Sequence, residues 1–145
     1  MILKSFELPK IKLNNYKFYL FYGDNEGLKE ENIKNLFEKN YKDKIHRYEE
    51  KQILDNINIF FNSILTKSFF DNEKLIIINR ATDKIRTIIE DLIEKNPEDI
   101  QVILNSKNLE KKSTLRKLFE KEKSIVCIPF YEDNNQTLNS IISLF

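Results

Sequence analysis

The sequence predicts an α/β domain built on a parallel five-stranded sheet with helices on both faces. Four short apolar runs are nearly continuous, which is typical of strands that a parallel sheet buries on both sides. These runs are Phe18–Tyr22, Leu75–Ile78, Val102–Leu104 and Ile125–Ile128. A weaker run at Lys44–Tyr48 predicts a fifth strand at one edge of the sheet.

Apolar residues at helical spacing separate these runs. The clearest pattern keeps the order i, i+3, i+4, i+7, i+8 without a gap and comprises Ile85, Ile88, Ile89, Leu92 and Ile93. Four further stripes lie within residues 33–37, 53–65, 115–119 and 138–145. Strands that alternate with helices in this way form parallel sheets with right-handed crossovers.

Polar residues mark several helix ends. Thr82-Asp83 and Ser113-Thr114 stand where N-terminal caps are needed, and Asn134-Asn135 precedes the last stripe. Asn96-Pro97 predicts the end of the third helix, because the residue before a proline avoids the α region.

Composition restricts the class of protein. The chain has 145 residues and a net charge of +1, which fits one domain (residues 1–145) without a global field to attract nucleic acid or membranes. No apolar run approaches the ~20 residues that cross a bilayer, and the start lacks a secretory signal. Cys127 is the only cysteine, so no internal disulfide forms. We expect a cytoplasmic domain without a membrane partner, cut at a boundary from a longer chain.

Ligands of open α/β sheets bind beyond the carboxyl ends of the strands, and the first such end carries a degenerate phosphate loop. A working loop reads G-x-x-x-x-G-K-[ST]. Here Gly23 and Gly27 are one residue too close, Leu28 displaces Lys29, and Glu30 stands where a hydroxyl is needed. We therefore expect a P-loop NTPase-like core that lacks a functional Walker A motif, with Asp24 or Asn25 serving as a helix cap.

Neighbouring charges also argue against nucleotide chemistry. Asp24 and Glu26 place carboxylates in the loop, and one such charge ~4 Å from a phosphate costs about 4 kcal/mol at an effective dielectric of about 20. The third strand ends in Asn79-Arg80, without the carboxylate that organises magnesium in nucleotide hydrolases. We expect no catalytic residue, no cofactor and no metal, and therefore no enzyme activity in this domain.

The remaining candidates are isolated residues or mixed clusters. His46, the only histidine, suits a surface position on the edge strand, and Cys127 suits the core. The cluster Lys107, Lys111, Lys112, Arg116 and Lys117 could contact DNA. Interspersed glutamates favour a solvated helix face instead.

A phenylalanine pair near the end of the second helix stands out. Phe69 continues the buried stripe four residues after Leu65, whereas Phe70 is rotated by about 100° on a helix. With charged neighbours, the pair has the features of a protein-docking anchor. The alternative is that the chain leaves the helix here and both rings pack under the sheet; periodicity does not choose between the two.

Three stretches together resemble the delta subunit of bacterial DNA polymerase III, the clamp-loader subunit that opens the sliding clamp. Residues 18–28 are similar to the opening strand and degenerate loop of that family, and 66–76 to its clamp-binding corner and third strand. Residues 102–104 and 108–118 are similar to its fourth strand and the lysine-rich helix that follows. The resemblance covers essentially the whole chain, as the first domain of that subunit.

The resemblance implies an AAA+-like fold without ATPase activity. In the family, a small residue, a leucine and a phenylalanine insert into a pocket on the clamp; these positions match Ser68, Phe69 and Phe70, with Phe69 in place of the leucine. Leu65, Thr66 and Lys67 lead into them and complete the predicted clamp-binding set. The implied partners are the sliding clamp (the beta subunit) and, through further domains, other loader subunits, with DNA contacted weakly or indirectly at most.

Two other functions remain open from the residues alone. One is an active nucleotide-binding enzyme with an atypical loop between Gly23 and Lys29, which requires magnesium-dependent nucleotide binding. The other is a DNA-contacting module that uses Lys111, Lys112 and Arg116, whose DNA affinity would fall steeply with salt.

Overall fold

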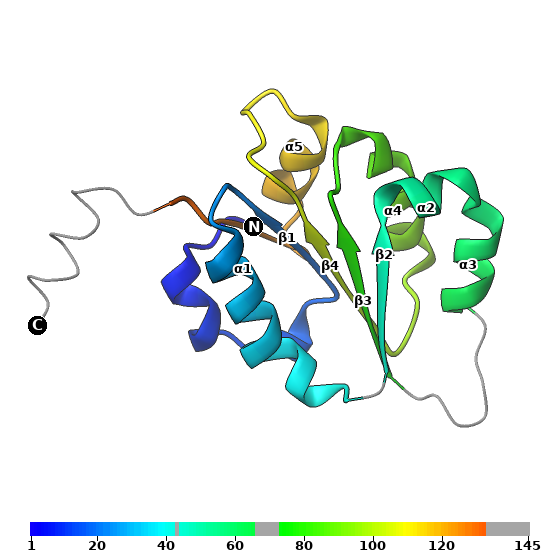
Figure 1. The fold of residues 1–145 in the computed structure, drawn as a ribbon, viewed down its shortest axis with the longest axis horizontal. Coiled ribbons are helices and arrows are strands. Elements are labelled where there is room, and N and C mark those ends of the chain that lie inside the picture. The colour runs from blue at the N-terminus through cyan, green and yellow to red at the C-terminus, as the bar shows by residue number, and fades with distance from the viewer. Residues whose placement is uncertain (43, 66–72, 133–145) are drawn as a thin grey trace, which may run out of the picture.

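The computed structural model describes residues 1–42, 44–65 and 73–132, and these form a parallel sheet between two layers of helices (Figure 1). The strands are β1 (Phe18–Tyr22), β2 (Ile45–Glu49), β3 (Lys74–Asn79), β4 (Ile100–Asn105) and β5 (Val126–Pro129). Their order across the sheet is β2-β3-β4-β1-β5, and every pairing is parallel. The predicted fold class is confirmed, including the edge strand β2.

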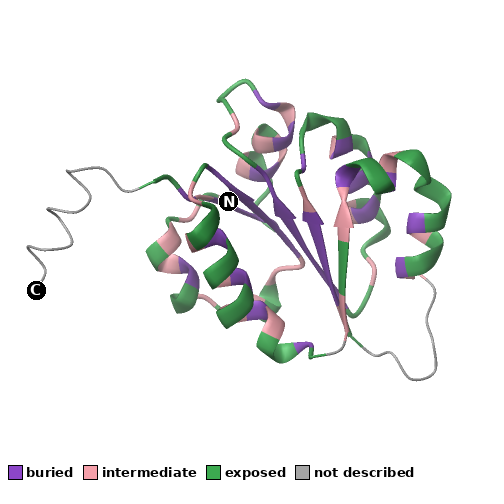
Figure 2. Cartoon of the chain, viewed as in Figure 1, coloured by how far each residue is buried: buried purple, intermediate pink, exposed green. Residues whose placement is uncertain are grey.

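Alternate residues of each strand pack against opposite helical layers. Phe18, Leu20 and Tyr22 of β1 join one core, whereas Tyr19 and Phe21 join the other. The first core is covered by α2 (Glu50–Asp55), α3 (Ile57–Leu65), α4 (Arg86–Lys95) and α5 (Thr114–Lys121). The second is covered by the 3₁₀ helix η1 (Ser5–Lys10), α1 (Glu26–Asn32) and the π-helical turn η3 (Ile33–Phe37). The central strands are therefore buried on both faces (Figure 2).

Three short 3₁₀ helices, η2 (Leu13–Asn15), η4 (Glu38–Asn40) and η5 (Asp83–Ile85), complete the described elements. None of the helices in the described ranges is long and apolar enough to cross a membrane.

The apolar stripe at 53–65 predicts one helix, but the structure divides it into α2 and α3. Asn56 separates them with φ −147° and ψ 68°, outside the helical region. Asparagine favours such breaks because its side chain competes for backbone hydrogen bonds. Because both helices pack on the same core, the apolar stripe continues across the break, and the periodicity gives no sign of it. Ile57, which the stripe places in the core, is 40% exposed.

The predicted caps hold two helices in place. Thr82 accepts a hydrogen bond from the Lys84 N–H, and Ser113 accepts one from the Arg116 N–H. Helix α4 ends at Lys95, and Asn96 adopts the left-handed conformation (φ 44°) that often terminates a helix. The stripe at 138–145 and its cap Asn134-Asn135 lie outside the described residues.

The N-terminal segment extends the sheet in a way that no sequence pattern predicts. Ile2 forms an isolated parallel bridge with Cys127, and the Leu3 N–H donates to the Cys127 carbonyl. Leu8 is fully buried against the second core. Residues before β1 thus line the outer side of β5, where the strand order otherwise ends.

Candidate functional site

A polar cavity lies at the carboxyl edge of the sheet, where open α/β sheets place their ligands. Its volume is about 560 Å³. Its walls come from α1, the ends of β2, β3 and β4 and the residues just after β3 and β4: Glu26, Glu30, Glu49, Asn79, Arg80, Asn105, Ser106 and Lys107. Three of these eight side chains are carboxylates, so the wall does not present a uniformly positive surface to an anion.

The turn between β1 and α1 is bound by the segments that leave β4 and β5. The Gly23 N–H donates to the Lys107 carbonyl (3.2 Å), and the Asn25 N–H donates to the Phe130 carbonyl (3.0 Å). Gly23 has φ 118°, and a Cβ there would lie 2.1 Å from the Phe130 oxygen. Glycine is needed here because the backbone comes close to the residue that follows β5. A phosphate would have to displace these backbone partners.

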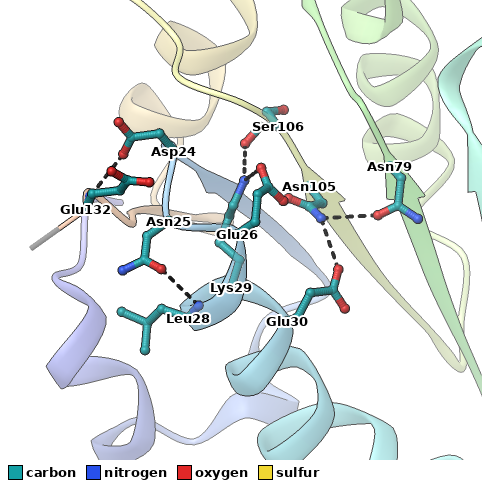
Figure 3. Close-up of polar contacts among 10 residues, drawn as sticks. All are labelled: Asp24, Asn25, Glu26, Leu28, Lys29, Glu30, Asn79, Asn105, Ser106 and Glu132. Atoms are coloured by element: carbon teal, nitrogen blue, oxygen red, sulfur yellow. Dashed lines mark hydrogen bonds and ion pairs between the residues drawn. The ribbon is translucent and has the colours of Figure 1, made fainter.

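Asn25, one of the two predicted caps, begins α1. Its side-chain oxygen accepts a hydrogen bond from the Leu28 N–H (3.1 Å). Asp24 instead accepts from the Glu132 N–H (2.9 Å), which adds a second tie between the loop and the segment after β5 (Figure 3). The interpretation of this region as a capped strand–turn–helix corner is confirmed.

Lys29 points inward and is fully buried (0% exposed). Its ammonium donates to Glu26 Oε1 and to the Ser106 carbonyl, both at 2.7 Å (Figure 3). The charge that neutralises phosphate in a working loop is thus used to join α1 to the end of β4. From the sequence, Lys29 is notable only because it is displaced from the lysine position of a working phosphate loop. Its partner Ser106 lies 77 positions away, and no local sequence pattern predicts the contact.

The ends of β3 and β4 meet through carboxamides. Asn105 Nδ2 lies 3.2 Å from Asn79 Oδ1 and 3.5 Å from Glu30 Oε1 (Figure 3). Among the described residues, no group of three His, Cys, Asp or Glu side chains is arranged to hold a metal ion.

The predicted clamp-binding corner falls mainly outside the described residues, which include neither Thr66 and Lys67 nor Ser68, Phe69 and Phe70. Leu65 is described: it is the last residue of α3 and packs, partly buried, on the first core. The same helix leaves Ile59 63% exposed. Ile59 stands off the buried stripe, so periodicity gave no reason to select it.

The predicted positions of His46 and Cys127 are confirmed. His46 is exposed on the edge strand β2. Cys127 is completely buried in β5, where burial and, secondarily, the nearby Glu120 carboxylate raise the pKa of its thiol to about 12. A thiol that stays protonated at neutral pH is a poor nucleophile.

Two residues of the basic cluster at Lys107–Lys117, Arg116 and Lys112, have partners within the chain. Arg116 is only 14% exposed, donates to the Leu109 carbonyl (2.8 Å) and lies 3.4 Å from Glu120. Lys112 pairs with Glu110 at 3.3 Å.

Beside this cluster, Asp83 accepts hydrogen bonds from the Ser113 hydroxyl (2.6 Å) and from the Leu115 N–H. Burial alone would raise the pKa of Asp83, but these hydrogen bonds and Arg86 lower it overall.

Comparisons with known proteins agree with this architecture. The Bacillus subtilis DNA clamp loader delta protein (YqeN) is similar in fold, with a TM-score of 0.66 and 16% sequence identity. The match covers 93% of this chain and 43% of that one, so the chain spans less than half of that protein's length. No curated protein sequence gives a significant match. A family model described as "DNA polymerase III, delta subunit" matches residues 19–128, and the chain therefore belongs to this family.

Proposed function

We propose that this chain is a non-catalytic clamp-loader domain that binds the sliding clamp and helps to open it during DNA replication. The observation that carries the proposal is the match to the delta subunit family over residues 19–128, which spans the corner after α3. The contact would be made by Ser68, Phe69 and Phe70, with Leu65, Thr66 and Lys67 leading into it.

The exposed face of α3 supports a docking role for this end of the molecule. Ile57 and Ile59 are 40% and 63% exposed, and α3 has no charged residue in its sequence. A partner that covered this helix would remove the exposed surface of both isoleucines from water, which favours a protein contact here. Burying each phenylalanine ring of the corner would add roughly 1.5–3 kcal/mol.

The loop after β1 supports a role without hydrolysis. Its amides at Gly23 and Asn25 bind carbonyls of the same chain, and Lys29 is committed to Glu26 and Ser106. Clamp opening would then follow from binding alone: the domain must bind the open clamp more tightly than the closed one. ATP would act through partner subunits.

Calorimetry with the cognate sliding clamp tests the proposal. We expect Phe70→Ala to abolish clamp binding while leaving the unfolding transition unchanged. Phe6→Ala is the matched control, because Phe6 is a 63% exposed phenylalanine on η1, which covers the opposite face of the sheet. Retained binding in Phe70→Ala would contradict the site. Magnesium-dependent nucleotide binding by the wild type would contradict the non-catalytic role.

A further inference from the structure

The wall of the polar cavity contains buried oxygen atoms that no described part of the chain satisfies. Ser106 is 1% exposed, and its hydroxyl has no hydrogen-bond partner among the described residues. Glu49 Oε2 is also shielded from solvent and has no such partner there. A buried polar atom costs free energy unless it is hydrogen-bonded. Because both residues line the cavity, a ligand bound there can supply the missing hydrogen bonds.

The carboxylate of Glu30 is also available to a ligand in the cavity. Lys29 pairs with Glu26 at 2.7 Å, whereas Glu30 forms no ion pair with any described residue. The nearest donor given to Glu30 is Asn105 Nδ2, at a long 3.5 Å (Figure 3). A neutral amide at this distance does not compensate a full negative charge.

The two free cations of the cavity wall are exposed. The Arg80 side chain is 82% exposed, and its Nε lies 3.8 Å from Glu49 Oε2, so this ion pair contributes little. Lys107 is exposed and forms no ion pair with a described residue. Both long side chains keep their charges in water. The buried, unsatisfied atoms of the wall are therefore oxygens, and they call for a ligand that donates hydrogen bonds.

A guanidinium group has the chemistry that these oxygens require. It carries five N–H donors in a planar fork and no acceptor, and it binds carboxylates through two parallel hydrogen bonds. It is more weakly hydrated than an ammonium group, so it leaves water more readily. An anion, by contrast, would lie against Glu30 and Glu49. The volume of about 560 Å³ is within the range of ligand cavities.

We propose that this cavity binds a guanidinium group, carried by a small molecule or by an arginine side chain of a partner protein. Glu30 and Glu49 provide the negative charge, and the Ser106 hydroxyl accepts a further hydrogen bond. This goes beyond the proposed clamp contact, because the cavity lies between α1 and the ends of β2, β3 and β4, whereas the predicted clamp-binding residues follow α3.

The test is an NMR titration of the ¹⁵N-labelled chain with butylguanidinium and, at equal ionic strength, with butylammonium, which has the same stem and charge. We expect saturable shifts of the Asn105 and Ser106 amides with butylguanidinium and weaker binding of butylammonium. Glu30→Gln should weaken butylguanidinium binding at least about tenfold. Glu31→Gln is the matched control, because Glu31 is an exposed carboxylate on the same helix outside the cavity wall. It should bind as the wild type does.

A second variant separates binding from folding. Ser106→Ala removes a hydroxyl without a described partner, so the urea midpoint of unfolding should not fall. Butylguanidinium binding should weaken about two- to tenfold. A peptide with one arginine between two glycines distinguishes the sources: tighter binding of the peptide than of butylguanidinium assigns the ligand to a partner protein, and weaker binding to a small molecule.

Several outcomes overturn the proposal: no saturable shift in the folded wild type, equal affinity for the two cations, or equal losses in Glu30→Gln and Glu31→Gln. Binding that occurs only in Arg80→Gln would show that the chain's own Arg80 fills the cavity. Calorimetry with the clamp separates this proposal from the proposed function, because Glu30→Gln should bind the clamp as the wild type does.

Discussion

The β1–α1 loop and helix α3 differ in whether their side chains and amides have partners within the chain. In the loop, backbone amides, a lysine and two carboxylates are engaged by other parts of the same chain. In α3, isoleucines stay in water and no charged side chain accompanies them. The loop therefore uses its polar groups in contacts within the chain, whereas α3 leaves apolar surface exposed that the proposed clamp contact would cover.

The largest loss of stability should come from a substitution that forces the β1–α1 loop away from the end of β5. Gly23→Ala places a Cβ against the Phe130 carbonyl at a left-handed φ, so we expect a loss of more than about 3 kcal/mol in unfolding free energy, measured in urea. Gly27→Ala is the control. Its Cβ would meet only Asn25 Oδ1 at 3.9 Å, and alanine in α1 should gain up to about 1 kcal/mol.

A second test removes the buried ammonium. Lys29→Met keeps most of the side-chain volume but leaves the Ser106 carbonyl and Glu26 without their donor, so we expect a loss of about 1–3 kcal/mol. Lys34→Met, at an exposed position in the next turn, should change stability by less than about 0.5 kcal/mol. Equal stability of the two variants would show that the loop does not depend on this internal contact.

A substitution on the exposed face of α3 should change stability least. Ile59→Ala should leave unfolding within about 0.5 kcal/mol of the wild type, because the side chain is 63% exposed. If α3 extends the clamp contact, the same variant should weaken clamp binding by about 1 kcal/mol in calorimetry. A large loss of stability, or unchanged clamp affinity, would remove Ile59 from the interface.

The strands were predictable because a buried parallel sheet requires continuous apolar runs, and even the weak run at β2 was placed correctly. The break between α2 and α3 at Asn56 was not predictable, because both helices pack on one core and the apolar periodicity continues across the break. The bridge from Ile2 to β5 depends on a neighbour 125 positions later in the chain. The spacing of Gly23 and Gly27 identified the loop as degenerate. The inward orientation of Lys29 was not predictable, because it depends on the Ser106 carbonyl, which is distant in the sequence.

The cysteine in β5 gives the domain an intrinsic probe of its own opening. The Cys127 backbone pairs with β1 on one side and with the N-terminal segment on the other, whose Met1 carbonyl accepts its N–H. Its side chain packs in the first core with Leu115 and Phe119 of α5, so an alkylating reagent reaches the thiol only in molecules where this part of the core has opened. The rate of labelling therefore measures how often the core between α5 and β5 opens, and surface cysteines introduced elsewhere for fluorophores will react first.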